Sequence, residues 1–264
     1  MTLPEMDYDK IVEHITERLR WYAIDHARKE TGVLGLSGGI DSTVATYLAT
    51  MALGKDRVRV YLLPSRVTPK EDMEDARDVI ERLGIPSTNW KVIGIDEIVD
   101  IFEKTLEGMG NLERGNIMAR VRMIILHHEA ALHRGLVIGA GDKSELLMGY
   151  FTKYGDAGVD ILPIAGLYKT HVRRLAKHLK VPERIIKKPS SPRLWPGQTA
   201  EEELGIDYET LDTILYLKFD RGLDEEEITR RYAMPRELVK KALSRVEATR
   251  HKRRFPEIIE VNPY

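Results

Sequence analysis

The sequence predicts an α/β protein built on a doubly wound, mostly parallel sheet of the Rossmann-like kind, with further helices at its C-terminal end. Short apolar runs rich in β-branched residues alternate with longer segments of helical periodicity, which is typical of a parallel sheet covered by helices on both faces. Glycine-containing polar turns follow two of the apolar runs, at the edge where parallel sheets bind ligands. With 264 residues, the chain is expected to form one domain over residues 1–264.

The expected elements alternate along the first half of the chain. Residues 1–30 include an amphipathic helical segment, because Ile11, Ile15, Leu19 and Tyr22 recur at helical spacing between charged residues. Buried strands are predicted at 32–37, 57–64, 89–95 and 135–140, and helices at 40–53, 70–84 and 113–133. Beyond residue 140 the sequence becomes loop-like, and long loops in a compact domain are commonly functional. Three further helices are predicted at 207–219, 224–232 and 235–250.

Charge and cysteine content narrow the class of protein. Lys and Arg number 41 and Asp and Glu 42, so the chain has no overall basic field and a nucleic-acid partner is not expected. The absence of cysteine excludes disulfides, thiolate metal sites and a cysteine nucleophile. Residues 1–30 lack the apolar block of a signal peptide, and no apolar run reaches membrane-spanning length. A cytoplasmic protein without a membrane partner is therefore expected.

The stretch VLGLSGGIDSTVA at 33–45 is the most informative turn in the sequence. A strand that ends in SGG and enters a helix near Ile40 points free backbone N–H groups and the positive end of the helix dipole at one spot, which suits a phosphate. Asp41 would repel a bare phosphate, so its presence implies a bridging divalent cation, magnesium. The alternative is a structural turn in which Asp41 and Ser42 are ordinary residues of the first helical turn.

SGGIDS at 37–42 resembles the pyrophosphate loop of the ATP pyrophosphatases, enzymes of the adenine nucleotide alpha hydrolase-like fold that cleave ATP between its α and β phosphates. Four further motifs resemble the ammonia-dependent NAD synthetases of archaeal type in order and spacing: GNIMARVRM (115–123), GAGDKSELLMGYFTKYGDAGVDILPIAGLYKT (139–170), LWPGQTAEEELGIDYETLD (194–212) and HKRR (251–254). The resemblance implies ATP-dependent amidation of deamido-NAD by ammonia, which yields NAD, AMP and pyrophosphate through an acyl-adenylate. It also implies a homodimer with deamido-NAD near the subunit interface.

The resemblance implies roles for individual residues. Magnesium would lie between Asp41 and Glu145, and no general base is expected, because the loop and the metal stabilise the transition state. The residues implied for ATP are Gly35, Leu36, Ser37, Gly38, Gly39, Ile40, Asp41, Ser42, Lys169 and Ser191. The residues implied for deamido-NAD are Arg120, Lys153, Asp160, His251 and Lys252, whose cationic groups suit a pyrophosphate and a nicotinate carboxylate.

Alternatives to these roles remain open. Glu145 could be a solvated helix acid, Lys169 a surface side chain, and the RHKRR run at 250–254 a solvated basic helix end. Trp195, next to a proline in the loop after Ser191, could cover a nicotinate ring or could instead pack against the domain.

Two positions depart from the pattern of the family. Ala140 replaces the usual threonine that contacts ATP, and Ala157 replaces a glycine in the sequence DAG, so the affinity for ATP is in doubt.

Two rival functions differ in what they require of the sequence. Another ATP pyrophosphatase, an amidating or tRNA-modifying synthetase, would share the loop, but thiolation usually needs cysteines and a tRNA ligand favours a basic chain. A DNA reader would use the segment 224–246, which has the cadence of a helix-turn-helix, although four acidic residues crowd its first helix. Glutamine-using relatives carry an additional domain with a catalytic cysteine, so free ammonia is the expected nitrogen donor.

Overall fold

The computed structural model describes residues 3–261 and contains a parallel sheet of four strands in the order β3-β2-β1-β4. The strands are β1 (Thr31–Gly35), β2 (Val58–Leu62), β3 (Trp90–Val92) and β4 (Gly135–Val137). In the register of the sheet, Val33 pairs with Arg59 of β2 and with Val137 of β4. The predicted α/β fold and its parallel sheet are confirmed. Each strand ends two or three residues before its predicted C-terminal boundary, because the chain turns out of the sheet there.

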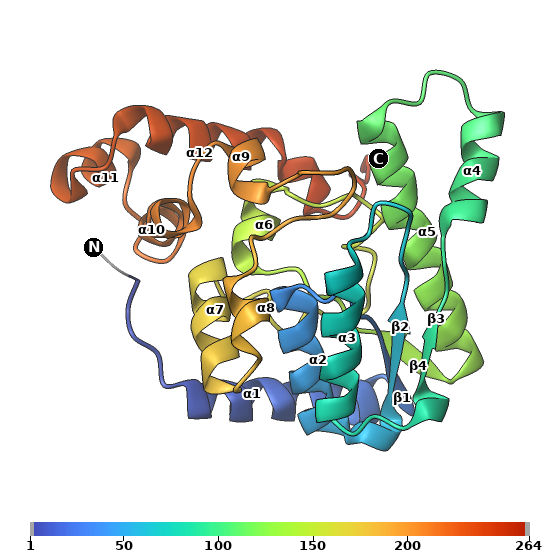
Figure 1. Cartoon of the computed structure of the whole chain (residues 1–264). Coiled ribbons are helices and arrows are strands. Elements are labelled where there is room, and N and C mark those ends of the chain that lie inside the picture. Colours follow the sequence, from blue (N-terminus) through green and yellow to red (C-terminus); the bar gives the residue numbers. More distant parts are fainter. Residues whose placement is uncertain (1–2, 262–264) are drawn as a thin grey trace.

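Helices cover both faces of this sheet (Figure 1), because alternate residues of each strand point to opposite faces. Leu34 belongs to the core beneath one layer of helices, whereas Val33 belongs to the core beneath the other. The first layer contains α1 (Tyr8–Arg20), α2 (Ile40–Leu53), α3 (Lys70–Arg82), α7 (Lys169–His178) and α8 (Glu183–Lys187). The second layer contains α4 (Asp96–Thr105) and α5 (Asn111–Leu132). The predicted helices at 40–53, 70–84 and 113–133 therefore correspond to α2, α3 and α5.

Five helices share a third core at the carboxyl end of the sheet, at the top of Figure 1. They are α6 (Lys143–Met148), α9 (Ala200–Leu204), α10 (Tyr208–Phe219), α11 (Glu225–Tyr232) and α12 (Arg236–Ala248). The three predicted C-terminal helices are confirmed within two residues. The segment that resembles a helix-turn-helix buries Ile228 of α11 and Val239 of α12 in this core together with α10.

The segment 141–206 is more helical than its composition predicts. It contains α6, α7, α8 and α9, of which only a helix near Glu145 was anticipated, and α4 was also missed. Helices α8 and α9 have five residues each, too few to show a helical period. A short π-helix at Trp21–His26 follows α1, and single 3-10 turns lie at Lys55–Arg57, Ser87–Asn89 and Arg250–Lys252. Between residues 3 and 261, no helix combines the length and the apolar character needed to cross a bilayer.

Candidate functional site

The turn between β1 and α2 is built around a glycine that no other residue can replace without strain. Gly38 has a φ of +78°, a conformation that costs a residue with a side chain about 1–2 kcal/mol. A Cβ atom on Gly38 would also lie only 2.1 Å from the carbonyl oxygen of Asp72 at the start of α3. The backbone of the loop therefore packs directly on the backbone of α3.

Two serine hydroxyls hold this loop in shape. Ser37 Oγ and Ser42 Oγ are 2.9 Å apart, the N–H of Gly39 donates to Ser37 Oγ, and Ser42 Oγ donates to the carbonyl of Gly39. Gly39 is the N-cap of α2, and the described structure shows no side chain that caps this helix. Since the first N–H groups of a helix have no partner within the helix, they remain available for an anion at this end of α2.

Three carboxylates surround one lysine beside this loop. The Lys169 ammonium lies 2.6 Å from Asp41 Oδ2, 2.9 Å from Asp142 Oδ2 and 2.9 Å from Glu145 Oε1. The four groups come from the first turns of three helices or, for Asp142, from the cap of one of them. Asp41 is the second residue of α2, Asp142 caps α6 by accepting the N–H of Glu145, and Lys169 begins α7. The three helix starts converge at the carboxyl edge of the sheet, so they bring these side chains together.

Burial determines the charge balance of this acid–lysine cluster, which consists of Asp41, Asp142, Glu145 and Lys169. The Lys169 side chain is 0% exposed, and burial alone would lower its pKa. Coulombic attraction by Asp142, Asp41 and Glu145 outweighs that effect and raises the pKa of Lys169 well above its usual value. Burial raises the pKa of Glu145 and of Asp142, which Lys169 partly offsets. Lys169 is therefore positively charged, and additional positive charge nearby would further stabilise the ionised form of the carboxylates.

The donor set suits a cation that phosphate oxygens also coordinate. Within residues 3–261, no group of three or more His, Asp or Glu side chains has the arrangement of an all-protein metal site. Mg²⁺ is commonly held by one or two carboxylates together with substrate phosphates, so two acids are sufficient. Asp41 Oδ1 is buried and finds no hydrogen-bond partner in the described residues, and is therefore a free oxygen ligand in the cluster. The residues present fit a magnesium ion that shares its coordination with a nucleotide.

A second ionic cluster ties the loop after α8 to the glycine turn. Lys188 Nζ donates to the carbonyl of Gly38 at 3.1 Å and lies 2.6 Å from Asp72 and 2.5 Å from Asp75. Arg193 also donates to Asp72, at 3.0 Å. Because Asp72 and Asp75 are nearly fully buried, these pairs fix the segment 188–193 against α3 and the glycine turn.

The two adjacent serines of this segment have different environments. Ser191 Oγ accepts the N–H of Arg193 at 3.1 Å, so it closes a local turn. Ser190 Oγ is buried and has no hydrogen-bond partner in the part of the chain that the structure describes. Further along, Leu194 packs against Gly115 of α5, and Trp195 is half-buried. The loop thus runs from the glycine turn to α5.

Four of the five residues implied for the dinucleotide lie in one connected set. Arg120 on α5 donates to the carbonyl of Lys153 at 3.3 Å, and Lys153 Nζ donates to the carbonyl of His251 at 3.0 Å. Lys252 Nζ donates to the carbonyls of Gly149 and Phe151, and burial lowers the pKa of Lys252. The basic run at the C-terminal end is therefore partly fixed by hydrogen bonds to the segment after α6.

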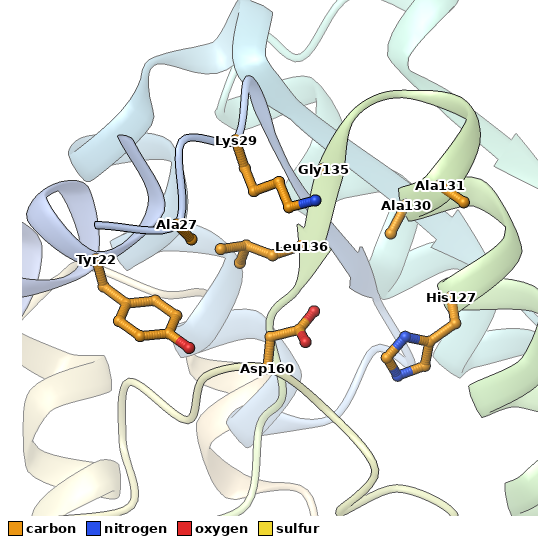
Figure 2. Close-up of a pocket in the computed structure, with 9 residues that line it drawn as sticks. All are labelled: Tyr22, Ala27, Lys29, His127, Ala130, Ala131, Gly135, Leu136 and Asp160. Carbon is orange, nitrogen blue, oxygen red and sulfur yellow. The ribbon is translucent and has the colours of Figure 1, made fainter. Parts of the chain in front are cut away.

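The fifth residue, Asp160, makes different contacts. Its Oδ2 accepts the N–H of Val137 at 2.7 Å, at the end of β4. Asp160 also lines a cavity of about 260 Å³, where its carboxylate lies between the Tyr22 ring and the His127 imidazole, with Lys29 on another wall (Figure 2). The structure therefore distributes the residues implied for the dinucleotide over two places.

Several residues of the site have no clear signal in the sequence. Asp142 could have been found as an N-cap, because it stands three residues before Glu145. The roles of Asp72, Lys188 and Ser190 could not have been predicted from the sequence, since nothing in the neighbouring residues distinguishes them from ordinary surface residues. Ala140 lies at the edge of the first core, and Ala157 is half-buried, so the departures from the pattern are packed in without a polar contact from their side chains.

Comparisons with known proteins extend the similarity over nearly the whole chain. A family profile described as NAD synthase matches residues 11–256. The NH(3)-dependent NAD(+) synthetase of Saccharolobus solfataricus is 50% identical over 257 residues, which cover 97% of this chain and 91% of that protein. The NMN synthetase of Francisella tularensis superposes with a TM-score of 0.85 at 31% identity, and the NH3-dependent NAD synthetase of Campylobacter jejuni, bound to nitrate, with 0.83 at 33%. Each superposition covers 97% of this chain and 100% of the other.

Proposed function

The chain belongs to the NAD synthase family, and from this membership we propose that it catalyses the ATP-dependent amidation of deamido-NAD by ammonia. The observation that carries the proposal is the position of the acid–lysine cluster beside the uncapped N-terminus of α2. ATP is the co-substrate in this family, and its triphosphate needs both anion-binding N–H groups and cations. These lie together at the carboxyl edge of the sheet, where ligands bind in such folds.

We propose that the reaction begins with activation of the nicotinate carboxylate, because a carboxylate is a poor electrophile for ammonia. One carboxylate oxygen of deamido-NAD attacks the α-phosphorus of ATP, the bond from that phosphorus to the α,β-bridging oxygen breaks, and pyrophosphate leaves. Ammonia then attacks the acyl carbon of the adenylate, AMP departs with the electron pair of the broken C–O bond, and the new amide nitrogen loses one proton to water. The protein contributes positioning and charge stabilisation and no general base is required.

The residues around the leaving pyrophosphate carry complementary charge. Asp41 and Glu145 would hold Mg²⁺, which supplies positive charge to the pyrophosphate oxygens when it is bound. Three carboxylates and one ammonium leave an excess of up to two negative charges in the cluster, which matches the charge of one such ion. Lys169 would bind a phosphate oxygen, and the N–H groups at the start of α2 would bind others. The buried, unpartnered hydroxyl of Ser190 supports that serine, in addition to Ser191, as a donor to ATP.

A homodimer would explain why the residues implied for deamido-NAD lie in two places. Arg120, Lys153, His251 and Lys252 would bind one part of the dinucleotide, and Asp160 of a second copy would bind another. Large apolar side chains exposed on or beside α4 and α5 support a subunit interface on that face: Ile98, Ile101, Phe102, Leu112, Ile124 and Leu132. We further propose that this is one domain over the whole chain, acting in the cytoplasm with small-molecule substrates.

The decisive experiment is pyrophosphate release by the purified protein with ATP, Mg²⁺ and ammonium. The carboxylate acceptors are deamido-NAD, nicotinate mononucleotide and aspartate, and NAD is quantified in parallel. We expect pyrophosphate and NAD in equal amounts with deamido-NAD only, and no turnover when glutamine replaces ammonium. Preferred turnover of nicotinate mononucleotide would instead assign the activity of the Francisella relative, and efficient use of glutamine would refute ammonia as the direct donor.

A further inference from the structure

Asp212 is a buried acid outside the acid–lysine cluster, on the face of α10 that meets α6 and α7. Its side chain is 0% exposed. Oδ1 accepts the hydroxyl of Ser144 at 2.5 Å, and Oδ2 accepts the N–H of Thr170 at 2.8 Å. Its neighbours Leu211, Ile214 and Leu215 are fully buried apolar residues, so a carboxylate is exceptional among the buried residues of this helix. Since a buried carboxylate has a desolvation cost, packing alone does not account for it.

The two partners of Asp212 are directly adjacent to two members of the cluster. Ser144 precedes Glu145 in α6, and Thr170 follows Lys169 in α7. Ser144 Oγ in turn accepts the N–H of Lys169 at 2.9 Å. A continuous chain of hydrogen bonds therefore connects α10 to the first turns of α6 and α7, from which the lysine and one of the carboxylates project.

The N-terminus of helix α7 is capped by this series of hydrogen bonds. Its N-cap residue is Tyr168, which offers no capping side chain, so the first N–H groups of α7 need partners from elsewhere. Ser144 satisfies the N–H of Lys169 and Asp212 satisfies the N–H of Thr170. A carboxylate at this position also interacts favourably with the helix dipole. Two distant residues thus perform the capping that a local aspartate performs in α10 and in α11.

We propose that Asp212 is a positioning residue for the adenylation step. Through Ser144 and Thr170, it fixes Lys169 and Glu145 relative to the glycine turn. This inference rests on the proposed function of the cluster. Asp212 reaches the cluster through the starts of α6 and α7, by way of Ser144 and Thr170. Supporting groups of this kind typically contribute about 10- to 100-fold when removed, because the groups that they hold lose their productive geometry.

The test compares two Asp→Ala variants of the same helix. Asp212→Ala removes the acceptor for Thr170 and Ser144, whereas Asp207→Ala removes the local N-cap of α10, which accepts the N–H of Thr210 at 2.9 Å. Both lose one backbone hydrogen bond, so both are expected to lower the melting temperature. Asp212→Asn is the rescue variant, because its amide can accept from Thr170 and donate to Ser144. Turnover is measured well below the melting temperature of every variant, with ATP, Mg²⁺, ammonium and deamido-NAD.

We expect Asp212→Ala to lower kcat about tenfold or more with the KM for deamido-NAD nearly unchanged, Asp207→Ala to keep wild-type kcat, and Asp212→Asn to recover most of it. Wild-type kcat in Asp212→Ala, an equal loss in both alanine variants, or a loss confined to the KM for deamido-NAD would overturn the inference. If Asp212→Ala does not fold, Ser144→Ala, which removes a single hydroxyl, gives the same readout. Inactivity of the wild-type protein would instead refute the proposed function itself, so the two failures are distinguishable.

Discussion

The ammonium of Lys169 lies 2.6 Å from Oδ2 of Asp41, although 128 residues separate the two in the sequence. Asp142 and Glu145 complete the same cluster, so the lysine lies between Asp41 and Glu145, the two acids expected to bind magnesium. Lys169 therefore provides internal positive charge at the position where the metal and the triphosphate are expected. This relationship between charge and burial leads to the first two predictions.

Removal of either proposed metal ligand should abolish adenylation. In Asp41→Asn and Glu145→Gln, the side chain keeps its size but loses its negative charge, so we expect pyrophosphate release to fall by about a hundredfold or more. Binding of deamido-NAD, measured by calorimetry without ATP, should change little. Glu237→Gln, on an exposed face of α12, is the matched control and should be fully active. Near-normal turnover in either of the first two variants would contradict the metal assignment.

Lys169→Met should destabilise the protein strongly, because it leaves the buried carboxylate of Asp142 and the partly buried carboxylates of Asp41 and Glu145 without their cation. We expect a loss of about 3–5 kcal/mol in the free energy of unfolding, measured with urea. Lys143→Met removes a lysine that pairs with Asp220 in a more exposed place, and it should cost less than about 1 kcal/mol. Millimolar Mg²⁺ should restore part of the stability of Lys169→Met and have less effect on the wild-type protein. Equal stability of the two variants would argue against the charge balance described here.

Gly38→Ala should impair ATP binding beyond the effect of backbone strain. Gly38 and Gly54 both have positive φ, at +78° and +84°, so alanine at either position is expected to cost about 1 kcal/mol or more. Only at Gly38 would the new methyl group collide with the backbone of Asp72, while Gly54 has open space around it. Nucleotide affinity, measured by calorimetry, should therefore fall markedly in Gly38→Ala and remain unchanged in Gly54→Ala. Similar affinities would show that the close approach to α3 is unimportant for the loop.

Ser190→Ala should raise the KM for ATP more than Ser191→Ala does. The hydroxyl of Ser190 is buried and has no hydrogen-bond partner in the described structure, so it is available to donate to a bound nucleotide. The oxygen of Ser191 already accepts the N–H of Arg193, so replacing this serine should mainly loosen a turn and weaken the contact with ATP less. We expect a several-fold change for Ser190→Ala, equivalent to one hydrogen bond of about 1 kcal/mol. The reverse order in steady-state kinetics would favour Ser191 as the donor.

Asp212 should make the stability of the protein fall as the pH rises. Burial raises the pKa of Asp212 from 3.8 to about 7, which Ser144 and Thr170 partly oppose. Between these two values the folded protein binds a proton more tightly than the unfolded chain, so ionisation weakens folding, by up to about 4 kcal/mol in total. Urea titrations at pH 4.5 and pH 7.5 should show wild-type protein losing stability relative to Asp212→Asn, which cannot ionise. A pH-independent difference between the two proteins would contradict the raised pKa.

Local sequence patterns were sufficient to predict the helices that have a clear apolar pattern and clear end signals. The bounds of α2 match the predicted 40–53, and α10, α11 and α12 lie within two residues of their predictions. The glycine turn marks the start of α2, the capping residues Asp207 and Asp224 mark the starts of α10 and α11, and amphipathic spacing marks α11 and α12. Helices α7, α8 and α9 were missed, since glycine, proline and polar residues surround short helices whose stability comes from packing.

The sequence by itself determined the α/β class, the glycine turn after β1 and the family, because periodicity, turn chemistry and motif spacing are local properties of the chain. Only the tertiary structure decided that Lys169 lies among Asp41, Asp142 and Glu145, that Lys188 joins Asp72 to Gly38, and that Asp212 caps a helix 42 residues away. The physical reason is that a buried charge is stabilised by whichever groups the packing of the helices brings within a few ångströms. That packing depends on the whole core and leaves no pattern in the neighbouring residues.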